Sequence, residues 1–199
     1  PPVDTEYFVP GTRPRDAFYV TASRLVPYKR IDMIAAAFAE LPDRKLVIVG
    51  TGPDDAKVRA SAGPNVEILG FQPRDVLRDL LQRARGFLFA AEEDFGIAPV
   101  EAQACGTPVI AFARGGATET VLGLDDPTPT GVFYEEQSAT ALADAVRRFE
   151  RASGEGRFSA ADCRRNAERF ARDRFRSDFT AAVAEAWGRH ALRHTSTMG

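Results

Sequence analysis

Two carboxylates, Glu93 and Glu101, flank a turn whose neighbours suit ligand binding. Residues 86–91, just before the turn, form a short apolar run, which is typical of a strand buried on both faces of a parallel sheet. Pro99 suits the first position of a helix, so Glu101 is expected in the first helical turn. Ligands of open α/β sheets bind where strands end and helices begin. We therefore predict a polar binding site at this turn.

The segment between the two carboxylates, Phe95-Gly96-Ile97, strengthens this prediction. Glycine lets a ligand come close to the main chain, and the N-terminus of the helix favours an anion. Glutamates at this separation are also expected by chance in a chain of this size. A capped, solvated helix start is therefore the alternative interpretation.

Two cations, Arg24 and Lys29, follow a predicted strand at 17–22, on the loop beyond its carboxyl end. A guanidinium grips phosphate oxygens with two parallel hydrogen bonds and an ammonium adds a point charge, each such bond being worth roughly 1.5–3 kcal/mol. The pair suits a diphosphate. Alternatively, Lys29 and Arg30 form a solvated helix start, but cations oppose the helix dipole there, so their placement calls for another reason.

The surrounding sequence supplies the elements that must position these side chains. Short apolar runs alternate with helical patterns, which predicts βαβ units. We expect an α/β fold, a Rossmann-like open parallel sheet with helices on both faces. The expected strands are 17–22, 45–49, 66–69, 86–91, 108–113 and 131–134, and the expected helices are 31–41, 54–61, 74–84, 97–105, 117–122 and one capped by Ser138 that runs to about Glu150.

The chain divides into three segments. Residues 1–14, with four prolines, are expected to be an interdomain connector, residues 15–157 the α/β domain, and residues 158–199 a C-terminal helical segment. Because the chain starts at Pro1 rather than methionine, we expect a fragment of a longer polypeptide. An apolar stripe on the last segment should pack on the same domain's core or on a second domain; it comprises Phe170, Phe175, Phe179, Val183 and Trp187.

Composition narrows the possible partners. The 199 residues are 44% hydrophobic and 27% charged, which is ordinary for a soluble globular protein, and the net charge of −2 gives no footprint for nucleic acid. No apolar run is long enough to span a bilayer. Cys105 and Cys163 lie far apart, which fits reduced cysteines of the cytoplasm and argues against a disulfide framework or a metal site.

Three glycine-containing turns follow other strands. Gly50-Thr51-Gly52-Pro53 resembles a dinucleotide-binding turn, but Asp55 stands at the third glycine position, so we expect a plain tight turn that lines the site. In Gly70-Phe71-Gln72, main-chain groups could meet the edge of a base, although an ordinary turn is the alternative. Gly115-Gly116 opens space at the same sheet edge, and function and a simple turn are weighed equally there.

Together these residues resemble a known pattern. The chain closely resembles the C-terminal donor domain of family 4 retaining glycosyltransferases with the GT-B fold, in which two Rossmann-like domains face each other and the last helix crosses back to the N-terminal one. The matching motifs, in order, are Ser23-Arg24-Leu25 with Lys29, Val47-Ile48-Val49-Gly50-Thr51-Gly52, Leu69-Gly70, Glu93-Asp94-Phe95-Gly96-Ile97-Ala98-Pro99-Val100-Glu101-Ala102 and Gly106-Thr107-Pro108-Val109-Ile110-Ala111.

The resemblance implies a role for each matching position. Arg24 and Lys29 would hold the diphosphate of a nucleotide-sugar donor and neutralise the leaving group, so no metal or cofactor is implied. Glu101 would accept hydrogen bonds from the ribose hydroxyls, and Val100 would pack beside the nucleoside. The base would lie near the turn of Gly70, Phe71 and Gln72.

At the sugar end, the resemblance implies that Glu93 is the catalytic residue. Glu93 and the main chain of Phe95, Gly96 and Ile97 would hold the sugar hydroxyls, with Glu93 on the face where positive charge develops. We favour positioning and electrostatic stabilisation by Glu93 over a nucleophilic role. The family's N-terminal domain, which supplies the acceptor site, is absent from these residues, so the isolated chain should bind donor but transfer slowly or not at all.

The donor and acceptor are less closely specified than the family. The Glu93–Glu101 motif, the connector Pro2-Val3-Asp4-Thr5-Glu6-Tyr7-Phe8 and the tail Asn166-Ala167-Glu168-Arg169-Phe170 resemble mannosyltransferases of surface-polysaccharide assembly, so we expect GDP-mannose and a lipid-linked or polysaccharide acceptor. A UDP-hexose is the main alternative. A GT-B sugar-nucleotide epimerase, a phosphorylase and a non-catalytic nucleotide-sugar-binding module stay open. We expect a cytoplasmic enzyme, with the inner face of the membrane as an alternative location for the full-length protein.

Overall fold

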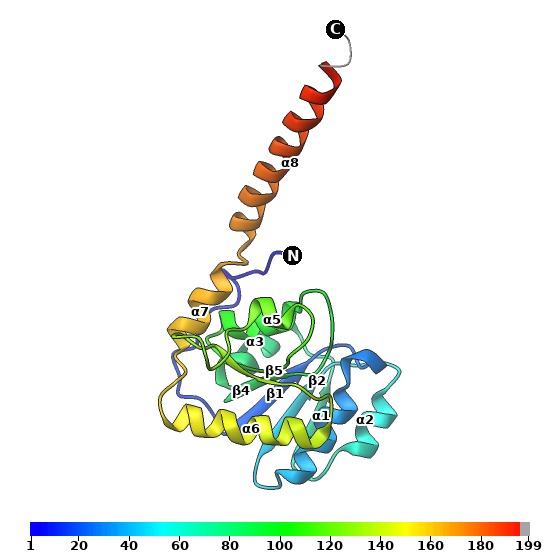
Figure 1. Ribbon diagram of the computed structural model, residues 1–199. Helices are drawn as coiled ribbons and strands as arrows, with labels where there is room; N and C mark the ends of the chain where they lie inside the picture. The colour runs from blue at the N-terminus through cyan, green and yellow to red at the C-terminus, as the bar shows by residue number, and fades with distance from the viewer. Residues whose placement is uncertain (196–199) are drawn as a thin grey trace.

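The computed structural model describes residues 1–195, and its centre is a six-stranded parallel sheet in the order β3-β2-β1-β4-β5-β6 (Figure 1). The strands are β1 (Phe18–Ala22), β2 (Lys45–Val49), β3 (Val66–Gly70), β4 (Gly86–Phe89), β5 (Val109–Phe112) and β6 (Gly131–Tyr134). The chain order reverses between β1 and β4, which pair directly. That reversal is the topological switch point at which open α/β sheets bind ligands.

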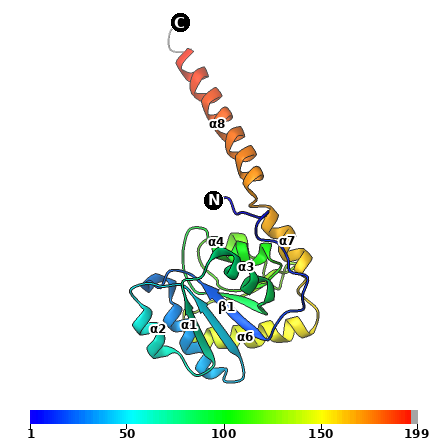
Figure 2. The ribbon, with the colours of Figure 1, turned by 180° about the vertical axis from the view of Figure 1, so that it is seen from behind.

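Helices cover both faces of the sheet (Figure 1; Figure 2). They are α1 (Ile31–Ala37), α2 (Asp55–Ser61), α3 (Arg74–Arg83), α4 (Ile97–Ala104), α5 (Ala117–Thr120), α6 (Ala139–Gly154), α7 (Ala160–Glu168) and α8 (Arg172–Thr195), with 3-10 turns η1 (Pro27–Lys29) and η2 (Phe38–Glu40). Alternate strand residues separate the two cores: Tyr19 packs with α1 and α6, whereas Val20 packs with α3 and α4. The predicted fold class and all six strands are thus confirmed.

Two helix predictions need correction. The helix expected at 31–41 ends at Ala37 and continues only as the η2 turn. The helix bearing Glu101 starts at Ile97, as its predicted range has it, because Gly96 adopts a left-handed conformation with φ 84° and serves as its N-cap; the predicted placement of Pro99 at the first helical position is wrong. Pro99 is therefore the third helical residue, and Glu101 lies in the second turn, not the first. Ser138 caps α6 as predicted, accepting a hydrogen bond from the Ala141 N–H.

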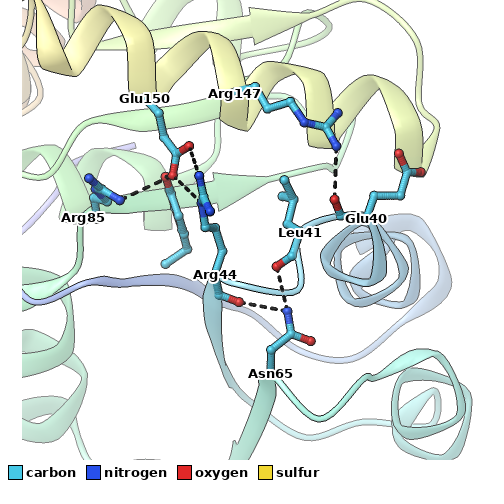
Figure 3. A network of polar contacts seen from close by, with 8 residues as sticks. Glu40, Leu41, Arg44, Asn65, Arg85, Arg147 and Glu150 are labelled. Carbon is cyan, nitrogen blue, oxygen red and sulfur yellow. Dashed lines mark hydrogen bonds and ion pairs between the residues drawn. The ribbon is translucent and has the colours of Figure 1, made fainter.

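A polar network ties α6 to the amino-terminal edge of the sheet (Figure 3). Glu150 of α6 accepts two hydrogen bonds of 2.9 Å from Arg44, one of 3.3 Å from Arg85 and one of 3.1 Å from the Tyr19 hydroxyl. Asn65 donates to the carbonyls of Phe38, Leu41 and Arg44, which anchors the turn before β2. This edge is opposite to the strand ends that carry the candidate site.

The first residues of the chain pack against the domain. Val3 and Phe8 are buried, and the Val3 N–H donates to the Phe170 carbonyl at 2.8 Å. Asp4 forms ion pairs of 3.1 Å with both Arg74 and Arg172. The entering chain and the segment between α7 and α8 are therefore joined to each other and to α3.

The helix α8 projects away from the sheet (Figure 1; Figure 2). Within the predicted apolar stripe, Phe170 contacts the Phe95 ring, with centroids 5.3 Å apart. The four stripe residues in α8 do not pack on the domain core, so that alternative is wrong for them: Phe175, Phe179, Val183 and Trp187 are 41%, 59%, 50% and 72% exposed. The cause is the break between α7 and α8, where Ala171 pairs with Val3 and turns the chain outward. Residues 196–199 of the predicted helical segment lie outside the described residues.

None of the helices in the described part of the chain combines the length and the apolar character that crossing a membrane requires.

Candidate functional site

Two adjoining cavities lie at the carboxyl ends of β1 and β4. The first, the acidic cavity, has a volume of about 540 Å³ and is lined by residues that include Lys29, Glu93, Phe95, Gly96 and Ile97. The second, the aromatic cavity, has a volume of about 380 Å³ and is lined by residues that include Thr51, Phe71, Gln72 and Leu77. Both cavities are lined by Ala22, Ser23, Arg24, Ala98 and Glu101, so together they form one elongated site.

Another cavity of about 540 Å³ lies at the opposite edge of the sheet, beside Arg44, Lys45, Asn65 and Glu67. Both of its cations are already paired. Arg44 pairs with Glu150 at 2.9 Å, and Lys45 pairs with Glu67 at 2.7 Å. An anionic ligand would therefore find no unpaired cation here, whereas Arg24 at the strand ends of β1 and β4 has no ion pair in the described part of the chain, so those strand ends are the stronger candidate.

The two predicted cations differ in their surroundings. Lys29 ends η1, its side chain is only 15% exposed, and its ammonium forms an ion pair with the Glu93 carboxylate. Arg24 is exposed and, within the described part of the chain, makes no side-chain hydrogen bond or ion pair. The site therefore contains one compensated cation and one guanidinium that is available to an anion.

Glu101 lies between the two cavities and has an unusual protonation equilibrium. Burial disfavours its charged form and raises its pKa from 4.5 to about 7, although the Arg74 charge opposes the shift. Its carboxyl group has no hydrogen-bond donor in the part of the chain that the structure describes. A ligand that donates hydrogen bonds here would satisfy a group already removed from most of the surrounding water.

Two glycines allow the loop that carries Arg24 to pack closely against the turn that follows β2. A Cβ on Gly50 would lie 1.8 Å from the Ser23 carbonyl oxygen, and one on Gly52 would lie 2.2 Å from the Leu25 carbonyl oxygen. The Leu25 N–H also donates to the Thr51 carbonyl at 3.0 Å. The Gly50-Thr51-Gly52 turn is thus a tight turn that supports the loop after β1, and Gly50 and Thr51 line the aromatic cavity.

A second glycine pair supports the loop that carries Glu93. The Gly116 N–H donates to the Glu93 carbonyl at 2.7 Å. A Cβ on Gly115 would lie 2.5 Å from that same oxygen, and one on Gly116 would lie 2.4 Å from the Asp94 carbonyl oxygen. The sequence leaves a functional role and a simple turn equally open for Gly115-Gly116. The structure shows a turn that packs closely against the loop that carries Glu93.

The remaining predicted residues lie in different positions. Phe71 is 78% exposed at the mouth of the aromatic cavity, and Gln72 donates its side-chain amide to the Leu69 carbonyl at 2.8 Å. Gly70 adopts φ 69°, which shapes this turn, but it lines neither cavity. Val100 is completely buried in the core on the α4 side of the sheet, so the structure does not bring it to the cavity surface.

The comparison with known proteins identifies the family. Residues 3–170 match the sequence pattern of the family described as glycosyl transferases group 1. The chain belongs to this family. Its sheet is that of the Rossmann-like C-terminal domain of a GT-B glycosyltransferase, as the resemblance implied.

Curated relatives of this group 1 domain are similar over parts of their length. A GDP-mannose-dependent α-(1-6)-phosphatidylinositol monomannoside mannosyltransferase of Mycolicibacterium smegmatis is 34% identical over 78% of this chain and 48% of its own. A D-inositol 3-phosphate glycosyltransferase of Mycobacterium sp. (strain KMS) is 34% identical over 58% of this chain and 31% of its own. The chain therefore spans less than half the length of these relatives.

Solved structures share the fold. Sucrose-phosphate synthase from Thermosynechococcus elongatus superposes with a TM-score of 0.78 at 26% identity, covering 94% of this chain and 51% of its own. Anabaena HepE in complex with UDP-glucose superposes with a TM-score of 0.74 at 21% identity, covering 92% of this chain and 56% of its own.

Some residues that line this candidate site have no role predicted from the sequence. Ser23, Ala98 and Leu77 line the cavities, and no residue-type signal distinguishes them. The sequence predicts Arg30 only as part of a helix start, yet Arg30 adopts φ 53° and donates a hydrogen bond to Gln137. The opposition of its charge to the helix dipole was the one available signal.

Proposed function

We propose that this chain is the donor-binding half of a family 4 retaining glycosyltransferase that transfers a hexosyl group from a nucleotide sugar. The observation that carries the proposal is the order of groups along the two cavities: Phe71 at one end, Glu101 and Arg24 in the middle, and Lys29 with Glu93 at the other. This order matches a base, a ribose, a diphosphate and a sugar. A nucleotide sugar is the ligand class that needs all four.

In this proposal each end of the site has its own task. Glu101 accepts hydrogen bonds from the ribose hydroxyls, and Arg24 and Lys29 bind the diphosphate. The turn that Gly70 shapes brings Phe71 to the base. Val100, a buried residue of α4, anchors this helix to the core. Glu93 and the main chain at Phe95-Gly96-Ile97 orient the sugar, next to the first N–H groups of α4, which have no partner within the helix.

The reaction breaks the bond between the anomeric carbon and the diphosphate oxygen and forms a bond from that carbon to an acceptor hydroxyl oxygen. The proton of the acceptor hydroxyl offsets the negative charge on the released diphosphate. Arg24 and Lys29 stabilise that charge as it builds, which is the electrostatic part of the catalysis. The Glu93 carboxylate stabilises positive charge at the anomeric carbon. The site as proposed works without a metal or cofactor.

We propose mannose from GDP-mannose as the transferred group, and a lipid-linked or polysaccharide acceptor. The support is the curated relatives, among them a GDP-mannose-dependent monoacylated α-(1-6)-phosphatidylinositol monomannoside mannosyltransferase of Corynebacterium glutamicum, 36% identical over 62% of this chain. A UDP-hexose is the second candidate. One observation favours it: the Gln72 amide is engaged by the Leu69 carbonyl, which leaves main-chain groups to read the base, and these accept several bases.

The proposal extends to the whole protein. An N-terminal domain outside these residues would supply the acceptor site, and the C-terminal segment 158–199 would cross back toward it, covering the exposed side chains of α8. The isolated chain would then bind donor but transfer slowly or not at all. The cytoplasm, or the inner face of a membrane for the full-length enzyme, is the location that a nucleotide-sugar donor and a lipid-linked acceptor favour.

Calorimetric titration of the chain with GDP, UDP, ADP and their hexose conjugates tests this function. We expect GDP-mannose to bind, and Arg24→Ala and Glu101→Ala to weaken binding by about tenfold each, equivalent to about 1.4 kcal/mol. Arg151→Ala, an exposed arginine of α6, is the matched control. Binding that is equal in all three variants would contradict the proposed site. Selective binding of UDP and its hexose conjugates would make a UDP-hexose the donor in place of GDP-mannose.

Two non-transferase classes are separated by activity. Incubation of donor with the full-length protein and no acceptor would show hydrolysis or epimerisation if the protein were an epimerase. A phosphorylase would instead release sugar phosphate from an oligosaccharide in the presence of inorganic phosphate. A binding module would show no transfer to any acceptor. Addition of EDTA should leave nucleotide binding unchanged if Arg24 and Lys29 are the only cations that the donor needs.

A further inference from the structure

Arg30 is the only residue other than glycine with a positive φ among residues 1–195, with φ 53° and ψ 35°. A side chain in this left-handed conformation is strained, and such residues persist where surrounding contacts hold them. Both main-chain groups of Arg30 are used: its N–H donates to the Pro27 carbonyl at 3.2 Å, and its carbonyl accepts from the Ile34 N–H at 3.1 Å. The strained residue therefore forms the corner between η1, which ends in Lys29, and α1.

The side chain of Arg30 is held as firmly as its backbone. Its guanidinium Nη1 donates to Gln137 Oε1 at 2.8 Å. Gln137 lies in the connection between β6 and α6, and its Nε2 donates to the Ala90 carbonyl at 2.7 Å. Ala90 directly follows β4 and precedes Glu93 by three residues. A chain of two hydrogen bonds thus joins the corner beside Lys29 to the base of the loop that carries Glu93.

The Gln137 amide can serve both partners in one orientation only. Its oxygen must face the guanidinium and its NH₂ group must face the carbonyl, because the reversed amide would place donor against donor and acceptor against acceptor. Neither Arg30 nor Gln137 lines the two cavities. They can therefore affect a bound ligand only through the segments that they join, which carry Lys29 and Glu93.

We infer that Arg30 and Gln137 are positioning residues that set the spacing between the Lys29 ammonium and the Glu93 carboxylate at the diphosphate and sugar end of the site. The inference rests on the proposed donor site for its functional consequence. The strut itself, which we define as the hydrogen bonds from Arg30 to Gln137 and from Gln137 to Ala90, concerns only this chain. A glycine at position 30 would relieve the backbone strain. An arginine at position 30 has this backbone strain, but its side chain joins the corner beside Lys29 to the loop that carries Glu93 through Gln137.

The first test uses no nucleotide. The chain has three lysines, and the Lys29 side chain is 15% exposed, against 56% for Lys45 and 59% for Lys57. Proton exchange of a shielded, ion-paired ammonium with water is slow, so in a ¹⁵N-lysine sample Lys29 should give the one protected NH₃⁺ signal, assigned by its loss in Lys29→Arg. Arg30→Asn keeps a residue that tolerates the left-handed conformation but cannot reach Gln137. We expect this variant and Gln137→Leu to broaden or lose the signal.

Arg148→Asn is the matched control, because it removes a guanidinium of α6 that donates to the Phe133 carbonyl of β6 at 2.7 Å, and neither residue lines the two cavities. Arg30→Lys, which keeps the charge on a slightly shorter side chain, should keep part of the protected Lys29 signal. The ammonium that this variant adds is identified as the signal that remains when Lys29→Arg is combined with it. Thermal melting shows whether each variant is folded. A folded Arg30→Asn or Gln137→Leu variant with an unchanged Lys29 signal would overturn the inference.

The second test measures donor binding. Arg30→Asn and Gln137→Leu should weaken GDP-mannose binding by about tenfold, as expected when one charge-assisted contact is displaced, whereas Arg148→Asn should bind as wild type does. Unchanged affinity in both strut variants would overturn the positioning role. If the wild-type chain bound no nucleotide while the variants still lost the Lys29 signal, the proposed function would fail and the strut would stand.

Discussion

At the scale of single residues, the site is arranged around incomplete charge compensation. Lys29 is paired with Glu93, whereas Arg24 faces the junction of the two cavities without an ion pair in the described part of the chain. A partly buried ammonium needs a counter-charge, and the Glu93 carboxylate supplies it. A diphosphate would complete the charge balance with Arg24 first. In our proposal Lys29 is then shared between the diphosphate and Glu93.

The raised pKa of Glu101 predicts a pH-dependent stability. The pKa is about 7 in the folded chain and 4.5 when the group is exposed, so between these values the folded state binds more protons than the unfolded state. The contribution of Glu101 to wild-type stability should therefore fall as pH rises from about 4.5 to about 7, and stay level above that range. Glu101→Gln removes the charge, and its free energy of unfolding should exceed that of wild type by about 1–3 kcal/mol at pH 8.

Urea unfolding of both proteins across this pH range measures the difference. The advantage of Glu101→Gln should vanish near pH 4.5, where the wild-type carboxyl is protonated when folded. Glu155→Gln, an exposed carboxyl at the end of α6, is the control and should follow wild type. A glutamine variant that is less stable than wild type at every pH would contradict the burial argument.

The residue types of the site could be predicted from the sequence, but their exact surroundings could not. The positions of Arg24, Lys29, Glu93 and Glu101 follow from strand ends and helix starts, and the structure brings all four to the acidic cavity. Val100 shows the limit, because whether it faces the core or the ligand depends on a helix register that Gly96 sets with its φ of 84°.

At the scale of elements, glycines decide how closely the loops pack. Gly116 has φ −61°, which any residue can adopt, so only the space around it matters. A Cβ there would lie 2.4 Å from the Asp94 carbonyl oxygen and from the Phe95 Cα. Gly116→Ala should therefore destabilise the chain by about 1–3 kcal/mol, as measured by urea unfolding, and weaken donor binding because the Glu93 loop must move.

Gly154→Ala is the matched control for this substitution. Gly154 ends α6, and nothing lies within 4 Å of the Cβ that alanine would add. Alanine favours helix over glycine, so this variant should be unchanged or more stable by up to about 1 kcal/mol. Equal effects of the two substitutions would show that space at Gly116 is not the determining factor.

The anchoring of α6 makes a separate prediction. Hydrogen bonds from Arg44 lower the pKa of Glu150 in the folded chain below its usual 4.5. The stability this provides is present above pH 4.5 and is lost as pH falls through the lower, folded-state pKa. Glu150→Gln should cost about 1–2 kcal/mol at pH 7, measured by urea unfolding, and Glu136→Gln, an exposed carboxyl, should cost nothing measurable. A cost for Glu150→Gln that is undiminished at pH 3 would contradict this assignment.

The elements themselves could largely be predicted, because apolar runs that are buried on both faces leave little choice of structure. The strands β2 and β6 have the predicted bounds, and the other strands differ by one or two residues at their ends. The predicted helix at 158 to about 192 shows the opposite case. Its periodicity continues through Phe170, but the pairing of Ala171 with Val3, more than 160 residues away in the chain, breaks it into α7 and α8.

At the scale of the whole molecule, the exposed face of α8 is the feature that the domain does not explain by itself. Phe175 and Phe179 stack on each other with ring centroids 5.7 Å apart, yet both remain exposed. Large apolar side chains gathered on one face of a helix are typical of a contact surface. The proposed N-terminal domain would cover this face, which is the simplest account of a helix that leaves its own core.

Trp187 makes that account measurable, because it is the single tryptophan of this chain and is 72% exposed. In the 199-residue chain, its fluorescence should be quenched by iodide almost as readily as that of free tryptophan. In the full-length protein, any tryptophans outside this chain are first replaced by phenylalanine. Packing of α8 against the proposed domain should then shield the indole of Trp187 and shift its emission to shorter wavelength. Trp187→Phe identifies the signal in both proteins. Equal quenching in both proteins would mean that α8 stays exposed. The proposal that segment 158–199 crosses to the N-terminal domain would then be wrong. The proposed donor site, which lies at the strand ends of the sheet, would be unaffected.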